Sequence, residues 1–508
     1  MTERRIRVRF APSPTGPLHM GGVRTALYNY LFAKKNGGDF LLRIEDTDQG
    51  RFVPGAEDYI RESLEWCGIS PVESPWVGGP HGPYRQSERK PMYRQYAEQL
   101  IASGHAYYAF DTPEELEEMR ERLTRAKVAS PQYNAVTRQT MRNSLTLSED
   151  EVHRRLDSGD PYVIRIKIPR KEEVRVHDLI RGWVVVQTAQ MDDKVLFKSD
   201  GMPTYHLANI VDDHLMEITH VIRGEEWLPS APLHVLLYRY LGWEDTMPQF
   251  AHLPLLLRPD GNGKLSKRDG DRLGFPVFPL NWKDPHTGEQ SSGYRERDYY
   301  PEAFVNMLAL LGWNPGTNQE IFSLDELVDA FSLERVGKSG AKFDPEKAKW
   351  FNQQYLRQRP ESELAADYMA QVTANGHAID ADKAARICAL VKEKAHFANE
   401  FWGLSTFFFD RPAGYDEGVI GKRWNPEARA FFEKLHAALT NCEWNGAAIE
   451  ACFNATAEAV SMKPGQVMQL FRVLTTGQAG GPVLFEVLVL LGRDETVERI
   501  VSALSKLQ

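Results

Sequence analysis

The sequence predicts a multidomain chain in which a parallel α/β sheet, split by an α/β insertion, is followed by an all-α region. Three observations lead to this prediction. The first hundred residues carry a strand, helix, strand pattern, a similar pattern returns near residue 219 after a charge-rich stretch, and helical periods dominate beyond about residue 301. A length of 508 residues also exceeds what one hydrophobic core usually fills, so at least three domains are expected.

The N-terminal pattern begins with a strand over residues 5–10, where arginines alternate with apolar residues until a proline-rich turn. A helix is predicted over 23–35, directly after Gly21-Gly22, and a glycine pair ends it. An apolar strand over 40–44 follows. Such a βαβ unit is typical of the Rossmann-type sheets that bind nucleotides.

The middle of the chain interrupts this sheet and then resumes it. A charge-rich, mainly helical stretch over 111–156 is followed by strand-like segments, whereas a strand over 219–222 and a helix over 225–241 restore the parallel pattern. The polar stretch 280–297 predicts an exposed loop. The predicted domains are the first half of the sheet at 1–105, the insertion at 106–190, the second half at 191–257, a loop-bearing region at 258–342 and a helical region at 343–508.

The composition excludes some classes of protein. A formal net charge of -9 argues against a whole-surface grip on nucleic acid, although local basic patches can still contact phosphates. The four cysteines form no CxxC pair, so we expect no zinc site and a reducing, cytoplasmic location. No uncharged apolar run is long enough to cross a bilayer, and no membrane partner is expected.

The stretch from Pro12 to Gly22 has the residues that a nucleotide site needs at a strand-to-helix junction. Prolines stiffen the turn, glycines let a ligand approach the backbone, and the helix start offers free N–H groups. We expect His19 to hydrogen-bond a phosphate; the alternative is a turn in which this imidazole only caps a helix. The predicted ATP-binding residues here are Pro12, Ser13, Thr15, His19, Gly21 and Gly22, and the last three are also predicted to be catalytic.

A second block, Gly261 to Gly270, is a glycine-bounded loop with three cations and a hydroxyl in five positions. Mobile cations suit a triphosphate, because a closing loop can place a lysine beside the charge that develops on departing pyrophosphate. Taken alone, the block is also consistent with a solvated basic turn. The predicted ATP-binding residues are Leu265, Ser266, Lys267 and Arg268, and Lys264 and Lys267 are predicted to be catalytic.

Together the two blocks resemble the HIGH and KMSKS signatures of class I aminoacyl-tRNA synthetases. The fuller strings RFAPSPTGPLHMGG, LLRIEDTD, YRQSER, SDGMPTYHLANIVDDHLM and VIRGEEWL resemble the bacterial glutamyl-tRNA synthetase family and span residues 9–228. One departure is Gly22, where the class signature has a second histidine. The resemblance implies a split catalytic domain, an acceptor-stem-binding insertion, a stem-contact region and helical anticodon-binding domains.

The resemblance also implies roles for single residues. Glutamate would be bound by Arg9, Ser13, Glu45, Tyr205, Asn209 and Arg223, with the arginines on its carboxylates and Glu45 on its ammonium group. Glu226 and Trp227 would contact the adenylate. From the residues alone, Arg9 and Glu45 are as readily an ion pair at the ends of adjacent strands, and Trp227 is as readily part of the core.

The activity implied is ATP-dependent formation of glutamyl-adenylate and its transfer to tRNA(Glu), with Mg²⁺ brought by ATP, no dedicated metal ligands, and a monomeric enzyme that needs tRNA before it activates glutamate. Three alternatives stay open: a form that also glutamylates tRNA(Gln), a tRNA-independent adenylate-forming or nucleotidyl-transfer enzyme, and a non-catalytic synthetase-like RNA-binding protein. A glutaminyl enzyme is expected to end in β-barrels, and the C-terminal helical periods argue against it.

Overall fold

The computed structural model describes residues 4–507, which form two compact units. The first contains the described chain up to Arg297 together with Phe304–Pro345, and the second contains Asp298–Ala303 together with the described chain from Glu346 onward. Within residues 4–507, no helix has the length and apolar character required to cross a membrane. The domain boundaries predicted above stay predictions.

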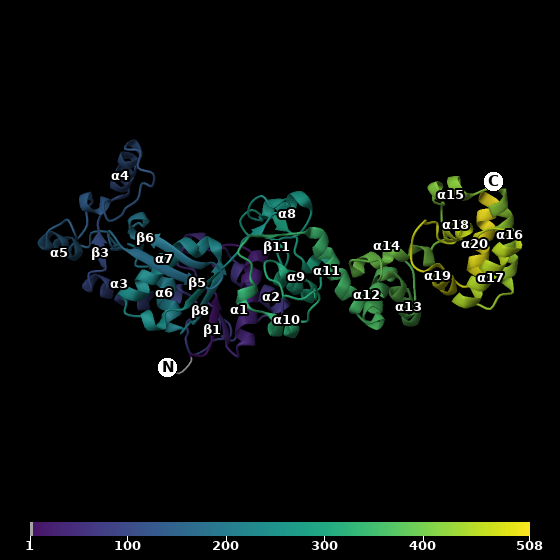
Figure 1. The fold of residues 1–508 in the computed structure, drawn as a ribbon, viewed down its shortest axis with the longest axis horizontal. Coiled ribbons are helices and arrows are strands. Elements are labelled where there is room, and N and C mark those ends of the chain that lie inside the picture. Colours follow the sequence, from purple (N-terminus) through teal and green to yellow (C-terminus); the bar gives the residue numbers. More distant parts are fainter. Residues whose placement is uncertain (1–3, 508) are drawn as a thin grey trace. The chain divides into compact units, whose positions relative to one another are not determined.

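A six-stranded sheet organises the first unit, in the order β2-β1-β8-β9-β5-β6. Its first five strands are parallel to their neighbours, and β6 is an antiparallel edge strand. Helices α6 and α7 pack against the sheet through a shared apolar core (Figure 1). These elements are β1 Arg7–Phe10, β2 Asp39–Leu42, β5 Glu173–Asp178, β6 Gly182–Gln187, β8 His220–Gly224, β9 Gln249–Leu253, α6 Tyr205–Leu215 and α7 Ala231–Tyr240.

The predicted βαβ unit is confirmed, because β1 and β2 are parallel neighbours joined through helix α1, Met20–Lys35. The predicted start of the helix at residue 23 is wrong, since the helix begins at Met20 and includes both glycines. The reason is a cap: the His19 side chain accepts a hydrogen bond from the Gly21 N–H and so replaces an intrahelical partner.

The strand order places a switch point at β1. This strand pairs with β2 on one side and with β8 on the other. In open parallel sheets the crevice at the carboxyl ends of the strands beside such a point is the usual place for a ligand. The chain leaves β1 into the proline-rich turn and leaves β8 into Glu225–Ser230, so both segments border this crevice.

The predicted helix over 225–241 is wrong in its first turns. Glu225–Ser230 is a 3₁₀ segment, and the α-helix α7 begins only at Ala231. Pro229 lacks an N–H and its ring would collide with the carbonyl four residues earlier, so an α-helix cannot run through this point. The break leaves the Trp227 side chain 41% exposed rather than in the core.

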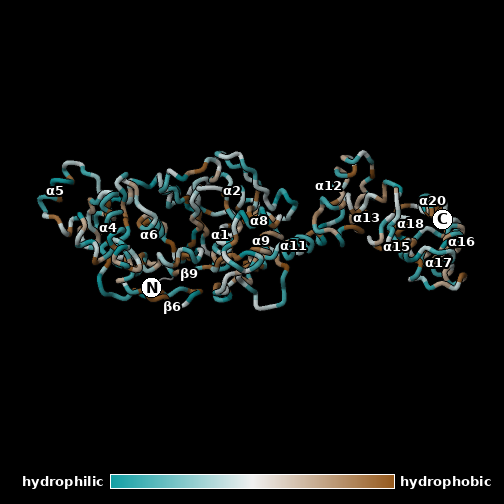
Figure 2. Tube along the Cα trace, turned by 90° about the horizontal axis from the view of Figure 1, so that it is seen from above, coloured by the Kyte–Doolittle hydropathy of each residue, from teal (hydrophilic) through white to brown (hydrophobic). Residues whose placement is uncertain are grey.

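The insertion contains a three-stranded sheet, β3-β4-β7, flanked by two strongly hydrophilic helices that appear teal in Figure 2. The β5–β6 hairpin lies inside the predicted insertion in sequence, but β5 pairs with β9 of the six-stranded sheet. The hairpin therefore forms one edge of the six-stranded sheet. The elements of this part are β3 Ala106–Ala109, α4 Pro113–Arg125, α5 Glu149–Asp157, β4 Val163–Ile166 and β7 Val195–Phe197, of which β7 lies past residue 190 in sequence.

The remaining elements up to β13 include those on either side of the basic loop at 261–270. Leu256 and Leu257 pair with Ala341 and Lys342, and the loop returns into the short helix α8. The predicted exposed loop over 280–297 contains a small hairpin. These elements are α2 Ala56–Trp66, α3 Lys90–Ala102, β10 Leu256–Leu257, α8 Lys267–Leu273, β11 Trp282–Lys283, β12 Gln290–Ser291, α9 Pro301–Leu310, α10 Leu324–Ala330 and β13 Ala341–Lys342.

The second unit is helical (Figure 1), as its sequence periods predict, and its buried residues form two apolar cores. One core gathers α12 to α14 with Leu356 of α11 and Val487 of α19, and the other gathers α15 to α20. The helices are α11 Pro345–Gln358, α12 Glu361–Ala374, α13 Ala381–Val391, α14 Phe401–Ser405, α15 Glu417–Arg423, α16 Pro426–Thr440, α17 Gly446–Ala459, α18 Pro464–Thr476, α19 Leu484–Leu491 and α20 Arg493–Lys506. The predicted α/β and all-α fold class is confirmed.

Candidate active site

A cavity of about 610 Å³ opens at the carboxyl ends of β1 and β8, where the strand order switches. Most predicted site residues line it, whereas Ser266, Lys267 and Arg268 do not. Residues predicted from segments more than 200 positions apart in the sequence therefore line the same cavity. The predicted residues in the wall are Arg9, Pro12, Ser13, Thr15, His19, Gly21, Gly22, Glu45, Tyr205, Asn209, Arg223, Glu226, Trp227, Lys264 and Leu265.

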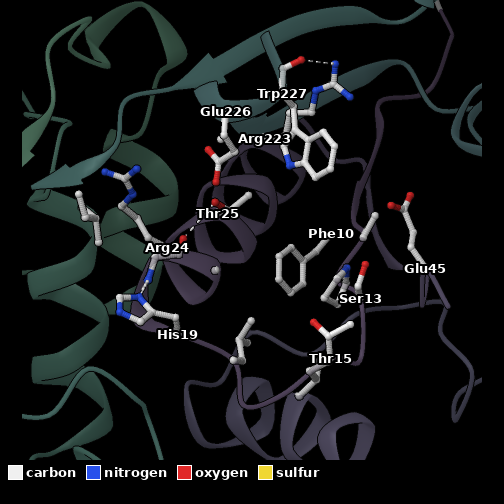
Figure 3. Close-up of a pocket in the computed structure, with 18 of the residues that line it drawn as sticks. Phe10, Ser13, Thr15, His19, Arg24, Thr25, Glu45, Arg223, Glu226 and Trp227 are labelled. Atoms are coloured by element: carbon white, nitrogen blue, oxygen red, sulfur yellow. Dashed lines mark hydrogen bonds between the residues drawn. The ribbon is translucent and has the colours of Figure 1, made fainter. Parts of the chain in front are cut away.

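The cavity has two ends of different chemistry (Figure 3). In this view Glu45, Ser13 and Trp227 gather on one side, and His19 and Arg24 lie on the other. The first end combines a carboxylate with guanidinium and hydroxyl groups. The second offers an imidazole, a buried guanidinium and the start of a helix.

The side chain of Arg9 is held in place by a buried ion pair. Its Nε and Nη2 donate to the two carboxylate oxygens of Asp213 on α6, at 2.9 and 3.0 Å. A guanidinium has five N–H groups, so this bidentate contact leaves three for a ligand. The alternative ion pair between Arg9 and Glu45 is wrong, because Asp213 takes the place of Glu45.

Arg223 reaches the same end from β8. Its Nη1 donates to the Tyr205 hydroxyl at 2.7 Å, its Nε donates to His252 Nε2 at 3.0 Å, and its Nη2 lies 3.4 Å from the Trp227 carbonyl oxygen. These contacts use three of the five N–H groups and leave one on each terminal nitrogen, the arrangement that grips a carboxylate with two parallel bonds. Burial raises the pKa of Tyr205 to about 12, so its hydroxyl is neutral.

Glu45 is the anion of this end. Its Oε1 accepts from Arg43 Nη2 at 2.9 Å and from Asn209 Nδ2 at 3.1 Å. Its Oε2 accepts no hydrogen bond from any residue in the described range 4–507. Because Glu45 lines the cavity, this oxygen is available to an ammonium group.

Arg43 is a residue that the sequence analysis did not single out, although it lies within LLRIEDTD. It is fully buried and bonds both Glu45 and Asp213. Burial disfavours its charge, but Asp213, Glu45 and Asp212 outweigh this effect and raise the pKa of Arg43. The available signal was a cation within an apolar strand-like run. A charged side chain at such a position is almost never fully buried unless it is paired, so a buried carboxylate partner was to be expected.

His19 anchors the other end. Its Nδ1 accepts from the Gly21 N–H at 3.2 Å, and its buried Nε2 has no partner among the described residues. Burial, and then the charge of Lys264, lower the pKa of His19 to about 4. The ring is therefore neutral, with its proton on Nε2, and it offers an unpaired donor in the cavity wall. Capping and ligand binding are compatible here, because each uses a different ring nitrogen.

Two further features of this end were not predicted. Arg24 lines the cavity and donates through Nη1 to the Leu311 carbonyl at 2.8 Å. Arg24 is the fifth residue of α1, and no local sequence pattern indicated its carbonyl partner. Gly22 packs closely on Leu18, since a Cβ at position 22 would lie 2.5 Å from Leu18 Cδ1 and the leucine side chain would have to move.

The basic loop is only partly engaged with the cavity. Leu265 is buried in its wall, whereas Lys264 Nζ lies 3.1 Å from Glu226 Oε1. Lys267 pairs instead with Glu289 of the β11–β12 hairpin, at 2.8 Å. The hydroxyl of Ser266 is hydrogen-bonded to Asp269 at 2.6 Å. Both lysines are thus paired with partly exposed carboxylates, an arrangement that is compatible with a basic turn at the surface as well as with a phosphate-binding loop.

No group of three or more His, Cys, Asp or Glu side chains that could hold a metal ion occurs within residues 4–507. The four cysteines are unbonded thiols. In the helical region, Lys463 is the N-cap of α18, and Arg472 lies within this helix and is half-buried.

Comparison with known proteins agrees with this architecture. A family model described as the catalytic domain of class I tRNA synthetases (E and Q) matches residues 5–350, and a model described as an anticodon binding domain matches residues 360–504. The matched segments follow each other in the order in which the sheet-based and helical regions occur.

Individual relatives match almost the whole chain. The glutamate–tRNA ligases of Cytophaga hutchinsonii and Amoebophilus asiaticus are 62% and 57% identical, and each alignment covers 99% of this chain and 98% of the relative. The crystal structure of a glutamate tRNA ligase from Elizabethkingia meningosepticum, in complex with its amino acid, gives a TM-score of 0.93 at 50% identity, covering 99% of this chain and 100% of that one. The chain belongs to the family of class I tRNA synthetases (E and Q), as the resemblance of its sequence strings predicted.

Proposed function

We propose that this chain is a glutamate–tRNA ligase, which activates L-glutamate with ATP and transfers it to the 3'-terminal adenosine of tRNA(Glu), with AMP and diphosphate as products. The observation that carries the proposal is the charge pattern of one cavity end. Two arginines with unused N–H groups, Arg9 and Arg223, face the same space as the free oxygen of Glu45. The names of the aligned relatives support the same activity.

This pattern complements a dicarboxylic α-amino acid. L-glutamate carries two carboxylates and one ammonium group, which match two guanidinium groups and one carboxylate. Charge-assisted hydrogen bonds of this kind are shorter and stronger than neutral ones. Glutamine would place a neutral amide where one guanidinium needs an anion, so the site should favour glutamate.

ATP is proposed to occupy the end formed by His19 and the basic loop, and to bring Mg²⁺ with it as part of the substrate complex. The neutral imidazole of His19 offers its Nε2–H to a phosphate oxygen. Lys264 and Lys267 would exchange their carboxylate partners for the triphosphate, which carries more charge than either carboxylate. Leu265 keeps the base of the loop fixed in the cavity wall.

The first step is in-line attack of the glutamate α-carboxylate on the α-phosphorus, which forms glutamyl-adenylate and releases diphosphate. Catalysis then depends on positioning and on lysine charges that meet the negative charge as it develops. In the second step a terminal ribose hydroxyl of tRNA attacks the adenylate carbonyl and releases AMP. Neither step needs a covalent bond to the protein.

The test is aminoacylation with labelled glutamate on purified tRNA(Glu) and tRNA(Gln) in parallel, with labelled glutamine as control. Charging of tRNA(Glu) alone is the expected result, and charging of both would identify the non-discriminating form. Full ATP–diphosphate exchange without tRNA would favour a tRNA-independent adenylate-forming enzyme. No charging with either amino acid would overturn the proposal and favour a non-catalytic RNA-binding protein.

A further inference from the structure

We propose that Asp178 and His252 are positioning residues that fix the guanidinium of Arg223 for the amino-acid substrate. The inference rests on the proposed function, because it assigns a role in glutamate binding. Neither residue lines the cavity, and both side chains are fully buried. They act through Arg223 rather than on the substrate.

The register of the sheet brings the three side chains together. Arg223 on β8 and His252 on β9 are direct partners in parallel strands, so their side chains leave the sheet on the same face. Asp178 ends the neighbouring strand β5. Three adjacent strands therefore contribute one residue each to a continuous row of polar groups in an otherwise apolar layer.

The hydrogen bonds along this row have a fixed direction. Asp178 Oδ2 lies 2.6 Å from His252 Nδ1, and His252 Nε2 lies 3.0 Å from Arg223 Nε. A guanidinium N–H can only donate, so Nε2 must be the acceptor and Nδ1 must carry the proton. The carboxylate of Asp178 thus selects the one neutral tautomer that can receive Arg223.

Asp178 is itself rigid. Its carboxylate oxygens accept hydrogen bonds from the backbone N–H groups of Ile180, Arg181 and His252. Burial, together with the nearby charge of Arg223, lowers the pKa of His252 despite its bond to Asp178. The imidazole is consequently neutral, and its Nε2 keeps the lone pair that Arg223 uses.

The contact matters because Nε sets the plane of the guanidinium. With Nε held by His252, Nη1 by Tyr205 and Nη2 by the Trp227 carbonyl oxygen, the two remaining N–H groups have a defined direction. Without the acceptor on His252, a buried Nε–H would lack a partner, and the group would turn to find one. Arg223 is only 6% exposed, so water cannot readily replace the histidine.

Two substitutions at position 252 separate positioning from simple packing. In His252→Gln the side-chain carbonyl can replace Nε2 as the acceptor for Arg223. In His252→Asn the shorter amide stays near Asp178 and does not reach Arg223. Asp178→Asn is a third variant. Its amide places an N–H group opposite one of the backbone or imidazole N–H groups whose hydrogen bonds the carboxylate accepts.

The experiment measures KM for glutamate and KM for ATP in tRNA(Glu) charging, with thermal unfolding of each variant as the folding control. We expect His252→Asn to raise KM for glutamate roughly tenfold to hundredfold with KM for ATP unchanged, as follows from the loss of a hydrogen bond to a charged group. His252→Gln should stay within a few-fold of the unmodified enzyme. Asp178→Asn should raise KM for glutamate several-fold.

Equal KM values for glutamate in the unmodified enzyme and in the His252→Asn and His252→Gln variants would overturn the inference. A rise of both KM values in parallel would overturn it too, because that is what a loosened sheet produces. If His252→Asn does not fold, Asp178→Asn decides between the same outcomes. The proposed function is tested separately by the unmodified protein. Absence of glutamate charging there refutes the function, whereas normal charging with unaltered variants refutes only the positioning role.

Discussion

Lys267 Nζ lies 2.8 Å from Glu289 Oε1, so the lysine expected to meet the triphosphate is held by a carboxylate outside the cavity wall. Glu289 adjoins strand β12 of the small β11–β12 hairpin, in the polar stretch that the sequence predicted to be an exposed loop. The pair must open before Lys267 can reach a phosphate. If ATP binds as proposed, the hairpin competes with it for this lysine.

Replacement of Glu289 by Gln should lower KM for ATP by about 1.5-fold to fivefold, because exposed ion pairs contribute roughly 0.2–1 kcal/mol. The measurement is ATP dependence of tRNA(Glu) charging at low ionic strength, where the pair is strongest. Gln290→Ala on the same hairpin is the matched control and should leave KM for ATP unchanged. An unchanged or higher KM in Glu289→Gln would contradict competition.

Removal of Arg43 should destabilise the fold strongly. Arg43→Met leaves Glu45 and Asp213 without their shared buried cation, and breaking a buried pair from one side costs about 3–5 kcal/mol. Urea unfolding measures this loss. Arg51→Met, which removes an exposed pair with Asp48, is the control and should cost less than about 1 kcal/mol. Similar losses in the two variants would show that the buried network does not anchor the site.

Stability should fall as the solution becomes acidic between about pH 6.5 and 4. Burial is the main cause that lowers the pKa values of His19, His206 and His220 to about 4 each. Since the unfolded chain binds protons at its ordinary histidine pKa, it is favoured within this window by up to about 1.4 kcal/mol per pH unit for each histidine. Titration of histidine ring protons by NMR checks the pKa values directly. Titration of these three rings near their ordinary pKa of about 6.5 would contradict the account.

The sequence predicted the βαβ unit, the helical second unit and most of the cavity wall. These features follow from the period of the hydrophobic pattern, from turn residues, and from the motif strings that contain His19, Glu45 and Arg223. Local information suffices here because the carboxyl ends of parallel strands necessarily share one edge. Lys264 and Leu265 were predicted differently, from the composition of the glycine-bounded basic loop and its resemblance to a class signature.

Other features depended on contacts that no local pattern encodes. The partner of Arg9 is Asp213 on α6 rather than Glu45, and the partner of Arg223 is His252 on a strand whose register the sequence does not specify. The 3₁₀ segment before α7 was overlooked although Pro229 was a visible signal. The pairing of Lys267 with Glu289 depends on how two loops pack, which hydrophobic periodicity cannot reveal.

The most direct test of the central claim is charging of tRNA(Glu) with labelled glutamate by the unmodified enzyme and by Glu45→Gln. The account predicts efficient charging by the former. It predicts a loss of roughly 30-fold or more in kcat/KM for glutamate in the variant, with KM for ATP unchanged, because the amide removes the charge that binds the ammonium group. Glutamate charging by Glu45→Gln at the unmodified rate and KM would contradict the assignment of this cavity end to glutamate.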